Sequence, residues 1–540
     1  MVNMNNSIIK HILLGGIITT LLTSCTGNYL DYNTNPYEVT KDEMGRDGYN
    51  LSAALIGMES YVVPVEEHLN QFTECLLGGP WGGYFADSQV WGNSFSYYNP
   101  SQEWLGKLYL DVMPNIYANM QDVKSATEDV IPISIAQIIK VAALSRVTDT
   151  YGPIPYSQVG LDGKLVAPFD TEKEVYYKMF DELTDAINTL TINRTQNLTA
   201  NADKVYSGNV EKWIKFANSL KLRMAMRICY VDKGKSEIMV KEAIDTSNGK
   251  LGVMTENSDN AFMPATINPF YMVCYSYNGG ETKISADLSS YMNGYQDPRR
   301  EIYGVTSTFD ESENITNGFH GLRVGNEYPI KTGQCYSNVK VEVSSPIMWM
   351  NAAEVMFLRA EAALRGWDTE KTPKAYYEAG IRLSFEQLGA KNVEDYLVST
   401  NTPESYKDPL GTYSFSGTPS TISVQWKDGN FEESLERIIT QKWIANFPLG
   451  LEAWAEFRRT GYPKLMGTAS NKSGGDIEEG KFPRRLTYPQ DEYKTNSENI
   501  RKAVTSLGGD YMHSRIWWDC NPRIVFITIE QPKLIRNIRV

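Results

Sequence analysis

Apolar positions recur every three to four residues over long parts of this chain, which is the spacing of one buried helix face. Residues 133–148 and 210–231 both show this pattern, with Ile, Ala, Leu, Met and Trp on one stripe. Residues 171–190 show it again, and Thr171 with Glu174 has the sequence of a capping box at the start of that segment. We therefore predict a helix over each of these three segments.

The strongest helical pattern is a pair of segments, 348–365 and 374–388, joined by a short turn. The second segment carries small residues, Gly380 among them, that would let two helices approach closely. Small residues that face large ones across a short helical hairpin resemble a tetratricopeptide-type unit, although no clean 34-residue period repeats. A last predicted pair covers 433–445 and 451–459. These hairpins would be degenerate units and not a regular array.

Long stretches rich in Gly, Asn, Ser and Tyr separate the helical segments, at residues 77–102, 255–345 and 400–430. Irregular segments of this length inside a compact domain are usually functional. The pattern as a whole predicts a mainly α fold with long irregular loops that carry few short strands.

The N-terminal segment has the features of a secretory signal peptide. A polar start with Lys10 precedes an apolar run at 12–22, which is too short to span a bilayer. The run closes on Leu22-Thr23-Ser24-Cys25, which looks like a bacterial lipobox. We predict that residues 1–24 are removed and that Cys25 is diacylated and anchors the mature chain to a membrane, with residues 25–50 as a tether. The alternative is a plain signal peptide followed by an incidental cysteine.

Charge and cysteine content exclude several kinds of partner and site. The formal net charge is −13, which argues against nucleic acid or anionic lipid as the main partner. Besides Cys25 the chain has five widely spaced cysteines without a CxxC motif, so we expect buried free thiols, no disulfide framework and no zinc site.

Catalytic motifs are not evident in the sequence. The chain has only four histidines, and it lacks HExxH, GxSxG and a phosphate-binding Gly-Lys loop. We predict a protein without catalysis, cofactor or metal. A glycosidase stays open as an alternative, because the spacing of Asp and Glu along a sequence does not reveal the separation of carboxyl groups that this reaction needs.

Aromatic residues interleaved with glycine form two candidate binding segments, at 78–104 and 270–279. A flat aromatic ring can stack on the apolar face of a pyranose while a neighbouring amide or carboxylate bonds the hydroxyl groups at its edge. The alternative is that these rings are core residues that anchor a long loop. The candidate ligand-binding residues are Trp81, Tyr84, Trp91, Asn93, Tyr275 and Tyr277.

Seven further blocks follow one another along the chain: Tyr29 to Pro36, Arg146 to Tyr156, Trp213 to Arg223, Glu354 to Arg365, Gln441 to Gly461, Arg484 to Pro489 and Trp517-Trp518-Asp519. In this order the blocks resemble the SusD/RagB family of outer-membrane nutrient-binding lipoproteins. Each block is weak by itself, and their number, their order and the lipobox together make the resemblance specific. Members of this family tend to place ligand-stacking aromatics in the region of Trp81, Tyr84 and Trp91.

The resemblance implies a SusD-like domain over residues 51–519, with residues 520–540 as an atypical tail. It implies a lipoprotein of the outer membrane that faces the cell exterior, captures an oligosaccharide and delivers it to a SusC-like TonB-dependent transporter. An oligopeptide ligand, or a structural lid without a ligand, are the alternatives. The residues after Cys25 lack an acidic cluster, which leaves a periplasmic orientation open. Asp297-Pro298-Arg299-Arg300 is similar to a family turn, and we expect a structural Asp–Arg pair there.

Overall fold

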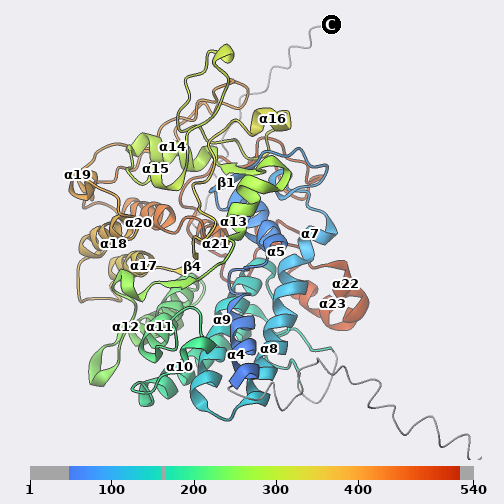
Figure 1. The fold of residues 1–540 in the computed structure, drawn as a ribbon, viewed down its shortest axis with the longest axis vertical. Helices are drawn as coiled ribbons and strands as arrows, with labels where there is room; N and C mark the ends of the chain where they lie inside the picture. Colours follow the sequence, from blue (N-terminus) through green and yellow to red (C-terminus); the bar gives the residue numbers. More distant parts are fainter. Residues whose placement is uncertain (1–47, 161–165, 523–540) are drawn as a thin grey trace, which may run out of the picture. The chain divides into compact units, whose positions relative to one another are not determined.

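Helices make up most of the regular structure of the chain (Figure 1), which a computed structural model describes at residues 48–160 and 166–522. Cys25, the predicted signal peptide, nearly all of the tether and most of the predicted tail lie outside the described residues. The first half contains α4 (Tyr49–Glu59), α5 (Glu67–Asn70), the π-helices η2 (Gln71–Gly78) and η4 (Leu108–Val112), α6 (Gly79–Trp81), the 3₁₀-helix η3 (Phe95–Tyr97), α7 (Gln102–Lys107), α8 (Met113–Ala126), α9 (Val130–Tyr151), α10 (Glu172–Ile192), α11 (Val210–Arg227) and α12 (Lys233–Ile244).

The second half adds shorter helices around the loops and a longer group near the C-terminus. The helices are α13 (Pro269–Tyr271), the π-helix η9 (Met272–Ser276), the 3₁₀-helix η10 (Tyr277–Gly279), α14 (Ala286–Tyr295), α15 (Arg300–Tyr303), α16 (Ile330–Gly333), α17 (Ala352–Leu364), α18 (Pro373–Leu388), α19 (Val393–Leu397), α20 (Phe431–Ala445), α21 (Gly450–Thr460), α22 (Gln490–Thr495) and α23 (Ser497–Ser506).

The three helices predicted first from periodicity are confirmed as α9, α10 and α11. The capping box at the start of α10 is also present, because the Thr171 hydroxyl accepts from the Glu174 amide while the Glu174 carboxylate accepts from the Thr171 amide. Among the described residues α9 alone is long and apolar enough to cross a membrane, and 78% of its apolar stretch is buried inside the protein. Burial of this extent is typical of a core helix of a folded domain.

Helices that follow each other in the chain pack as neighbouring pairs, with α17 and α18 as the most extensive pair, followed by α9 with α10 and α11 with α12 (Figure 1). The predicted close approach of α17 and α18 is confirmed, because a Cβ at Gly380 would lie 2.8 Å from the Phe357 ring. The predicted start of the first helix at residue 348 is wrong. Residues 347–350 form strand β4, since they pair with β2, and Asn351 then caps α17.

The described residues contain two small antiparallel sheets of two strands each. β1 (Phe85–Asp87) pairs with β3 (Thr282–Ile284), and β2 (Ala261–Met263) pairs with β4 (Ile347–Met350). The segment 255–345 was expected to be a long loop, and it also holds several helices, of which α14 is the longest. The mainly α architecture with few short strands is confirmed.

An ion-pair network in the interior joins α11, α17, α20 and α21. Arg459 makes a two-bond contact with Glu361 at 2.6 and 2.7 Å, and both side chains are fully buried. Lys442 lies within 3.5 Å of carboxylates from α17 and α21. Buried charges of this kind persist only when each has partners of opposite sign, so the network defines how these helices fit together.

The predicted Asp–Arg pair at the 297–300 turn is present. Arg299 binds Asp297 at 2.6 Å with both side chains fully buried, and its guanidinium also donates to Ser384 and Gln441. Of the five cysteines in the described residues, all are free; Cys75, Cys229 and Cys274 are buried as expected, whereas Cys335 is half-buried and Cys520 is exposed.

The free energy of unfolding is expected to fall as pH rises from about 4.5 to about 9, because of one buried carboxyl at the end of α4. Burial and the neighbouring Asp203 raise the pKa of Glu59 to about 9, so the folded protein holds a proton there that an unfolded chain with a pKa near 4.5 releases. The stability from this proton is complete below the unfolded pKa and is lost as pH rises through the folded one.

Chemical denaturation at pH 6 and pH 9 measures this effect. Glu59→Gln keeps a neutral side chain at every pH, so its loss of stability between these two values should be smaller than that of the unmodified protein. Glu498→Gln, which alters an exposed pair with Lys502, serves as the control and should leave the pH dependence unchanged. An equal pH dependence in Glu59→Gln would show that Glu59 is charged in the folded protein.

Candidate functional site

The pairing of β1 with β3 brings the two predicted binding segments together. Asp87 at the end of β1 lies opposite Thr282 at the start of β3, so the loop after β1 runs beside the turn before β3. The Ser88 amide donates to the Glu281 carbonyl at 2.7 Å, which continues the pairing by one residue. Segments that are far apart in sequence therefore lie side by side.

The carbonyl of Asn278 is the point where three segments meet. Gln89 Nε2 donates to it at 3.4 Å from the first segment, and Gln334 Nε2 donates to it at 2.7 Å from the end of α16. The turn has left-handed backbone at Asn278, and a Cβ at Gly280 would lie 2.6 Å from the Cys274 carbonyl oxygen. A glycine is required there because the chain must reverse tightly to reach β3.

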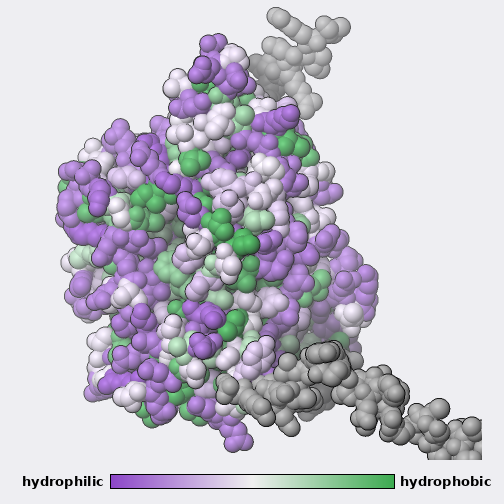
Figure 2. Space-filling model, in the orientation of Figure 1, coloured by the Kyte–Doolittle hydropathy of each residue, from purple (hydrophilic) through white to green (hydrophobic). Residues whose placement is uncertain are grey.

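We call this surface the candidate face and define it by Trp91, Asn93, Tyr275, Tyr277 and the amides around Asn278. In Figure 1 its elements α5, α7, α13 and β1 lie near one another, and Figure 2 shows the same side of the molecule as mostly polar with scattered apolar patches, some of them over the region of α13. The face is built from loops and short helices that the larger helices support.

Trp91 is half-buried in the loop after β1. Its ring meets the edge of Trp104 with centroids 5.7 Å apart, and Trp104 in turn lies 5.2 Å from Phe72. Asn93 is exposed in the same loop, and its Nδ2 donates to the Asn99 carbonyl at 3.0 Å. The loop therefore carries a half-buried aromatic ring and an exposed amide two residues apart.

Tyr275 and Tyr277 supply the second wall of the candidate face. Tyr275 is 38% exposed, and its ring stacks on Tyr271 with centroids 5.1 Å apart. Tyr277 stacks on His68 at 5.3 Å, and its hydroxyl donates to Glu67 at 2.7 Å. Each ring is held by a neighbour and a hydrogen bond, so the side chains are positioned before a ligand arrives.

Trp81 and Tyr84 do not belong to this face, which corrects the prediction that they stack on a ligand. Trp81 is 2% exposed, packs against Trp454 and donates to the Phe95 carbonyl at 2.9 Å. Tyr84 is fully buried, stacks on Trp443 and donates to its carbonyl. Their rings are enclosed by α20 and α21, which come from a distant part of the sequence, so no ring face is left for a ligand.

Three residues that contact the face, Trp104, His68 and Gln334, were not among the predicted ones. Trp104 lies inside the aromatic run that the sequence showed, so its proximity to Trp91 could have been expected. His68 and Gln334 had no sequence signal, because they come from a short helix and a loop whose position depends on the tertiary structure. His68 is exposed and contributes the ring that supports Tyr277.

Two buried carboxyl groups, Asp87 and Glu281, lie where β1 pairs with β3. Burial raises the pKa of Glu281, while Gln71 Nε2 and Asn278 Nδ2 donate hydrogen bonds that favour its charged form and oppose the shift. Burial also raises the pKa of Asp87 well above its usual value. The backbone amide of Gln89 donates to the Asp87 carboxylate at 2.8 Å, which lowers the pKa and only partly offsets the effect of burial. These groups hold the loops in place and are directed inward.

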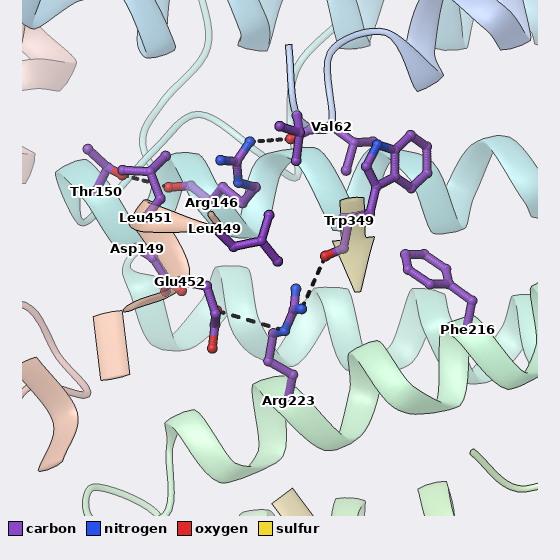
Figure 3. A pocket seen from close by; sticks show the side chains of 12 residues that line it. Val62, Arg146, Asp149, Thr150, Phe216, Arg223, Trp349, Leu449, Leu451 and Glu452 are labelled. Carbon is purple, nitrogen blue, oxygen red and sulfur yellow. Dashed lines mark hydrogen bonds and ion pairs between the residues drawn. The ribbon is translucent and has the colours of Figure 1, made fainter. Parts of the chain in front are cut away.

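The enclosed cavity in Figure 3 is not a ligand site of the same kind. It lies between α9, α11 and the start of α21, and its volume of about 30 Å³ is enough for one or two water molecules. Arg223 enters it from α11, donates to the Trp349 carbonyl at 3.3 Å and pairs with Glu452 at 3.8 Å. The cavity is therefore part of the interior ion-pair network.

Over residues 48–160 and 166–522 no group of three or more His, Cys, Asp or Glu side chains is arranged to hold a metal ion. The arrangement of the candidate face, with fixed rings and amide hydrogen-bonding groups, is suited to reversible binding of a polar molecule with flat apolar faces.

Comparisons with known proteins identify the family. The sequence profile described as SusD-like, "Susd and RagB outer membrane lipoprotein", matches residues 31–519. No curated protein sequence matches the chain.

Solved structures agree with this assignment. A SusD homolog from Bacteroides uniformis is 46% identical with a TM-score of 0.83, and the match covers 88% of this chain and 100% of that one. A SusD homolog from Bacteroides ovatus is 41% identical with a TM-score of 0.83, over 88% and 100% of the two chains. A chitin-binding SusD homolog from Flavobacterium johnsoniae is 34% identical with a TM-score of 0.81, over 87% and 99%. The chain therefore belongs to the SusD/RagB family of outer-membrane lipoproteins.

Proposed function

We propose that this protein binds an oligosaccharide on the candidate face and passes it to a SusC-like TonB-dependent transporter, without catalysis. The observation that carries the proposal is the pairing of β1 with β3, which brings together the segment of the half-buried Trp91 and the exposed Asn93 and the segment of the exposed Tyr275. Such a surface matches a glycan, whose rings stack on aromatics and whose hydroxyls bond amides. The chitin-binding relative supports a saccharide as the ligand class.

Family membership supports the location that we propose. A diacylated Cys25 would anchor the mature chain to the outer membrane, with the candidate face toward the cell exterior. Residues 25–50 would act as the tether between the lipid anchor and the binding domain. A lipid anchor of this kind fixes the protein at the surface without a membrane-spanning segment.

Replacing Trp91 by Ala is expected to weaken glycan binding at least tenfold, and Tyr275→Ala about as much. Each change removes a ring that covers the apolar face of a sugar, and a tenfold loss corresponds to about 1.4 kcal/mol. Isothermal titration of the full chain in detergent against a panel of glycan oligomers, with chitin oligosaccharides among them, measures the effect. Tyr49→Ala, which removes an exposed tyrosine outside the face, is the matched control and should bind as the unmodified protein does.

The other functions predict different results in the same titration. Binding heat with oligopeptides, and none with any glycan, would favour a peptide-binding lipoprotein. If neither glycans nor peptides give binding heat while the protein still associates with a transporter, a structural lid without a ligand would be favoured. Release of shorter products from a polymeric glycan would show catalysis and overturn the proposal.

A further inference from the structure

One buried carboxylate holds the turn of the candidate face from inside the protein. Glu281 is fully buried directly before β3, and its two oxygens accept from amide groups on two different segments. Gln71 Nε2, at the start of η2, donates to one oxygen at 2.5 Å, and Asn278 Nδ2 in the turn donates to the other at 2.6 Å. Glu281 therefore ties the turn to a helix that lies 210 positions before it in the sequence.

The turn needs such support because its backbone is strained. Asn278 has a φ of 51°, in the left-handed region that residues other than glycine rarely adopt. Conformations of this kind persist only where the surrounding structure holds them. Gln89 and Gln334 hold the carbonyl of Asn278, and Glu281 holds its side chain. Of these three bonds only the one to Glu281 has a charged acceptor, so it is the one that a proton can alter.

A proton on Glu281 changes what its oxygens can do. An ionised carboxylate only accepts hydrogen bonds, which matches the two amide donors, whereas a protonated carboxyl carries an O–H of its own. That hydrogen competes with one of the donors, so one of the two bonds is weakened or lost. Burial raises the pKa of Glu281 above its usual value of 4.5, although Gln71, Asn278 and His68 oppose the shift. At pH 4.5 more than half of the folded molecules therefore carry the proton, and at higher pH the charged form returns.

Other ionisable groups interact with the Glu281 charge from the elements around it, which are α5, η2, β1, η9 and η10. Burial raises the pKa of the Cys75 thiol well above its usual value, and those of Cys274 and Tyr277 to about 12. These three groups stay neutral between pH 4.5 and 7.5, which leaves His68 and Asp87 as the groups to control for. The complete set is His68, Cys75, Asp87, Cys274 and Tyr277.

We infer that Glu281 is a positioning residue of the candidate face: its negative charge holds the turn at residues 277–280 in the binding conformation, and its protonation loosens the turn and releases the glycan. The release of a glycan rests on the proposed function. The effect on the turn does not, because it can be measured without a ligand.

Hydrogen exchange of the full chain in detergent, read by mass spectrometry of peptides over residues 272–284, measures the turn directly. Glu281→Gln is neutral at every pH and places an NH₂ group against one of the two amide donors. At pH 7.5 we expect the amides of Gly280 and Glu281, which bond Tyr277 and Val273, to exchange at least twofold faster than in the unmodified protein. At pH 4.5 the two proteins should differ less, because the unmodified protein is then largely protonated too.

Asn278→Gly tests the same bond without a change in the buried carboxylate. Glycine adopts the left-handed backbone freely and lacks the side-chain donor, so the tie to Glu281 is lost while the turn keeps its shape. This variant should also exchange faster at pH 7.5. Glu498→Gln, on an exposed pair with Lys502, is the control and should exchange as the unmodified protein does.

Isothermal titration with chitin oligosaccharides and the other glycan oligomers, at pH 7.5 and 4.5, measures the consequence for binding. The apparent Kd of the unmodified protein should rise at least twofold at pH 4.5, since less than half of it is then competent to bind. Glu281→Gln should bind weakly at both pH values. His68→Phe, Asp87→Asn and Glu67→Gln each remove another group near the turn that can gain a proton, and each should keep the pH dependence.

The outcomes separate this inference from the proposed function. Unchanged exchange in both Glu281→Gln and Asn278→Gly at pH 7.5 would overturn the inference, whether or not a glycan binds. A pH dependence of binding that persists in Glu281→Gln, or that disappears in His68→Phe, would overturn it as well. If the turn responds as expected and no glycan binds at either pH, the proposed function fails while the role of Glu281 in the turn stands.

Discussion

Arg459→Met is expected to lower the free energy of unfolding by about 3–5 kcal/mol, which is the usual cost of leaving a buried charge without its partner. The guanidinium of Arg459 binds Glu361 by two hydrogen bonds and Glu456 by two more, and all three side chains are buried. Burial by itself would raise the pKa of Glu456, yet Arg459, Lys442 and Arg227 together hold it well below its usual value. Removing Arg459 leaves an excess of negative charge in the interior, and urea denaturation measures the loss.

Two further variants show whether the loss comes from the unpaired charge. Arg382→Met breaks an exposed pair with Glu394 and should change the stability by less than about 1 kcal/mol. The double substitution Arg459→Met and Glu361→Met removes both partners and should recover a large part of the loss, because apolar side chains of similar size can replace a buried pair. If the double variant is as unstable as Arg459→Met, packing and not charge is responsible.

Gly450→Ala is expected to destabilise the protein by about 3 kcal/mol, at the upper end of what overpacking usually costs. Gly450 begins α21 and touches the end of η2. A Cβ there would lie 2.3 Å from the carbonyl carbon of Gly78 and 2.5 Å from the amide nitrogen of Gly79. These are backbone atoms, which cannot rotate away as a flexible side chain can, so the two helices would have to separate.

A matched glycine shows that the effect depends on this contact. Gly234 lies in the first turn of α12, and the nearest atom to a Cβ there is Asp232 Oδ1 at 3.9 Å. Gly234→Ala should therefore stabilise the protein slightly, by up to about 1 kcal/mol, because alanine is the better helix former. Thermal unfolding of both variants is the measurement. A neutral effect of Gly450→Ala would mean that η2 and α21 can move apart without cost.

The same contact supports the candidate face. The π-helix η2 continues into α6 and then into β1, whose loop carries Trp91, and Trp81 of α6 packs on Trp454 of α21. We expect Gly450→Ala to weaken glycan binding as well as stability, because displacement of η2 would move the loop away from Tyr275. The face is positioned by contacts between segments that are more than 350 residues apart.

Local sequence patterns predicted the long helices well. The helices α9, α10, α11, α18 and α20 follow from a three-to-four spacing of apolar residues, and the capping box of α10 follows from Thr171 and Glu174. These features depend on residues within a few turns of each other, so they are visible without the rest of the chain. Residues 71–78 escaped prediction, since a π-helix does not follow the spacing of an α-helix.

The candidate face shows where local patterns stop being informative. Trp81, Tyr84, Trp91 and Tyr275 look alike in sequence, each an aromatic residue in a glycine-rich stretch. The sequence by itself determined the fold class, the family resemblance and the two segments that hold aromatic residues. Only the tertiary structure decided that Trp81 and Tyr84 are covered by α20 and α21 while Trp91 and Tyr275 stay accessible. Burial depends on which distant segments pack on a residue. The spacing of neighbouring residues along the sequence does not indicate which segments these are.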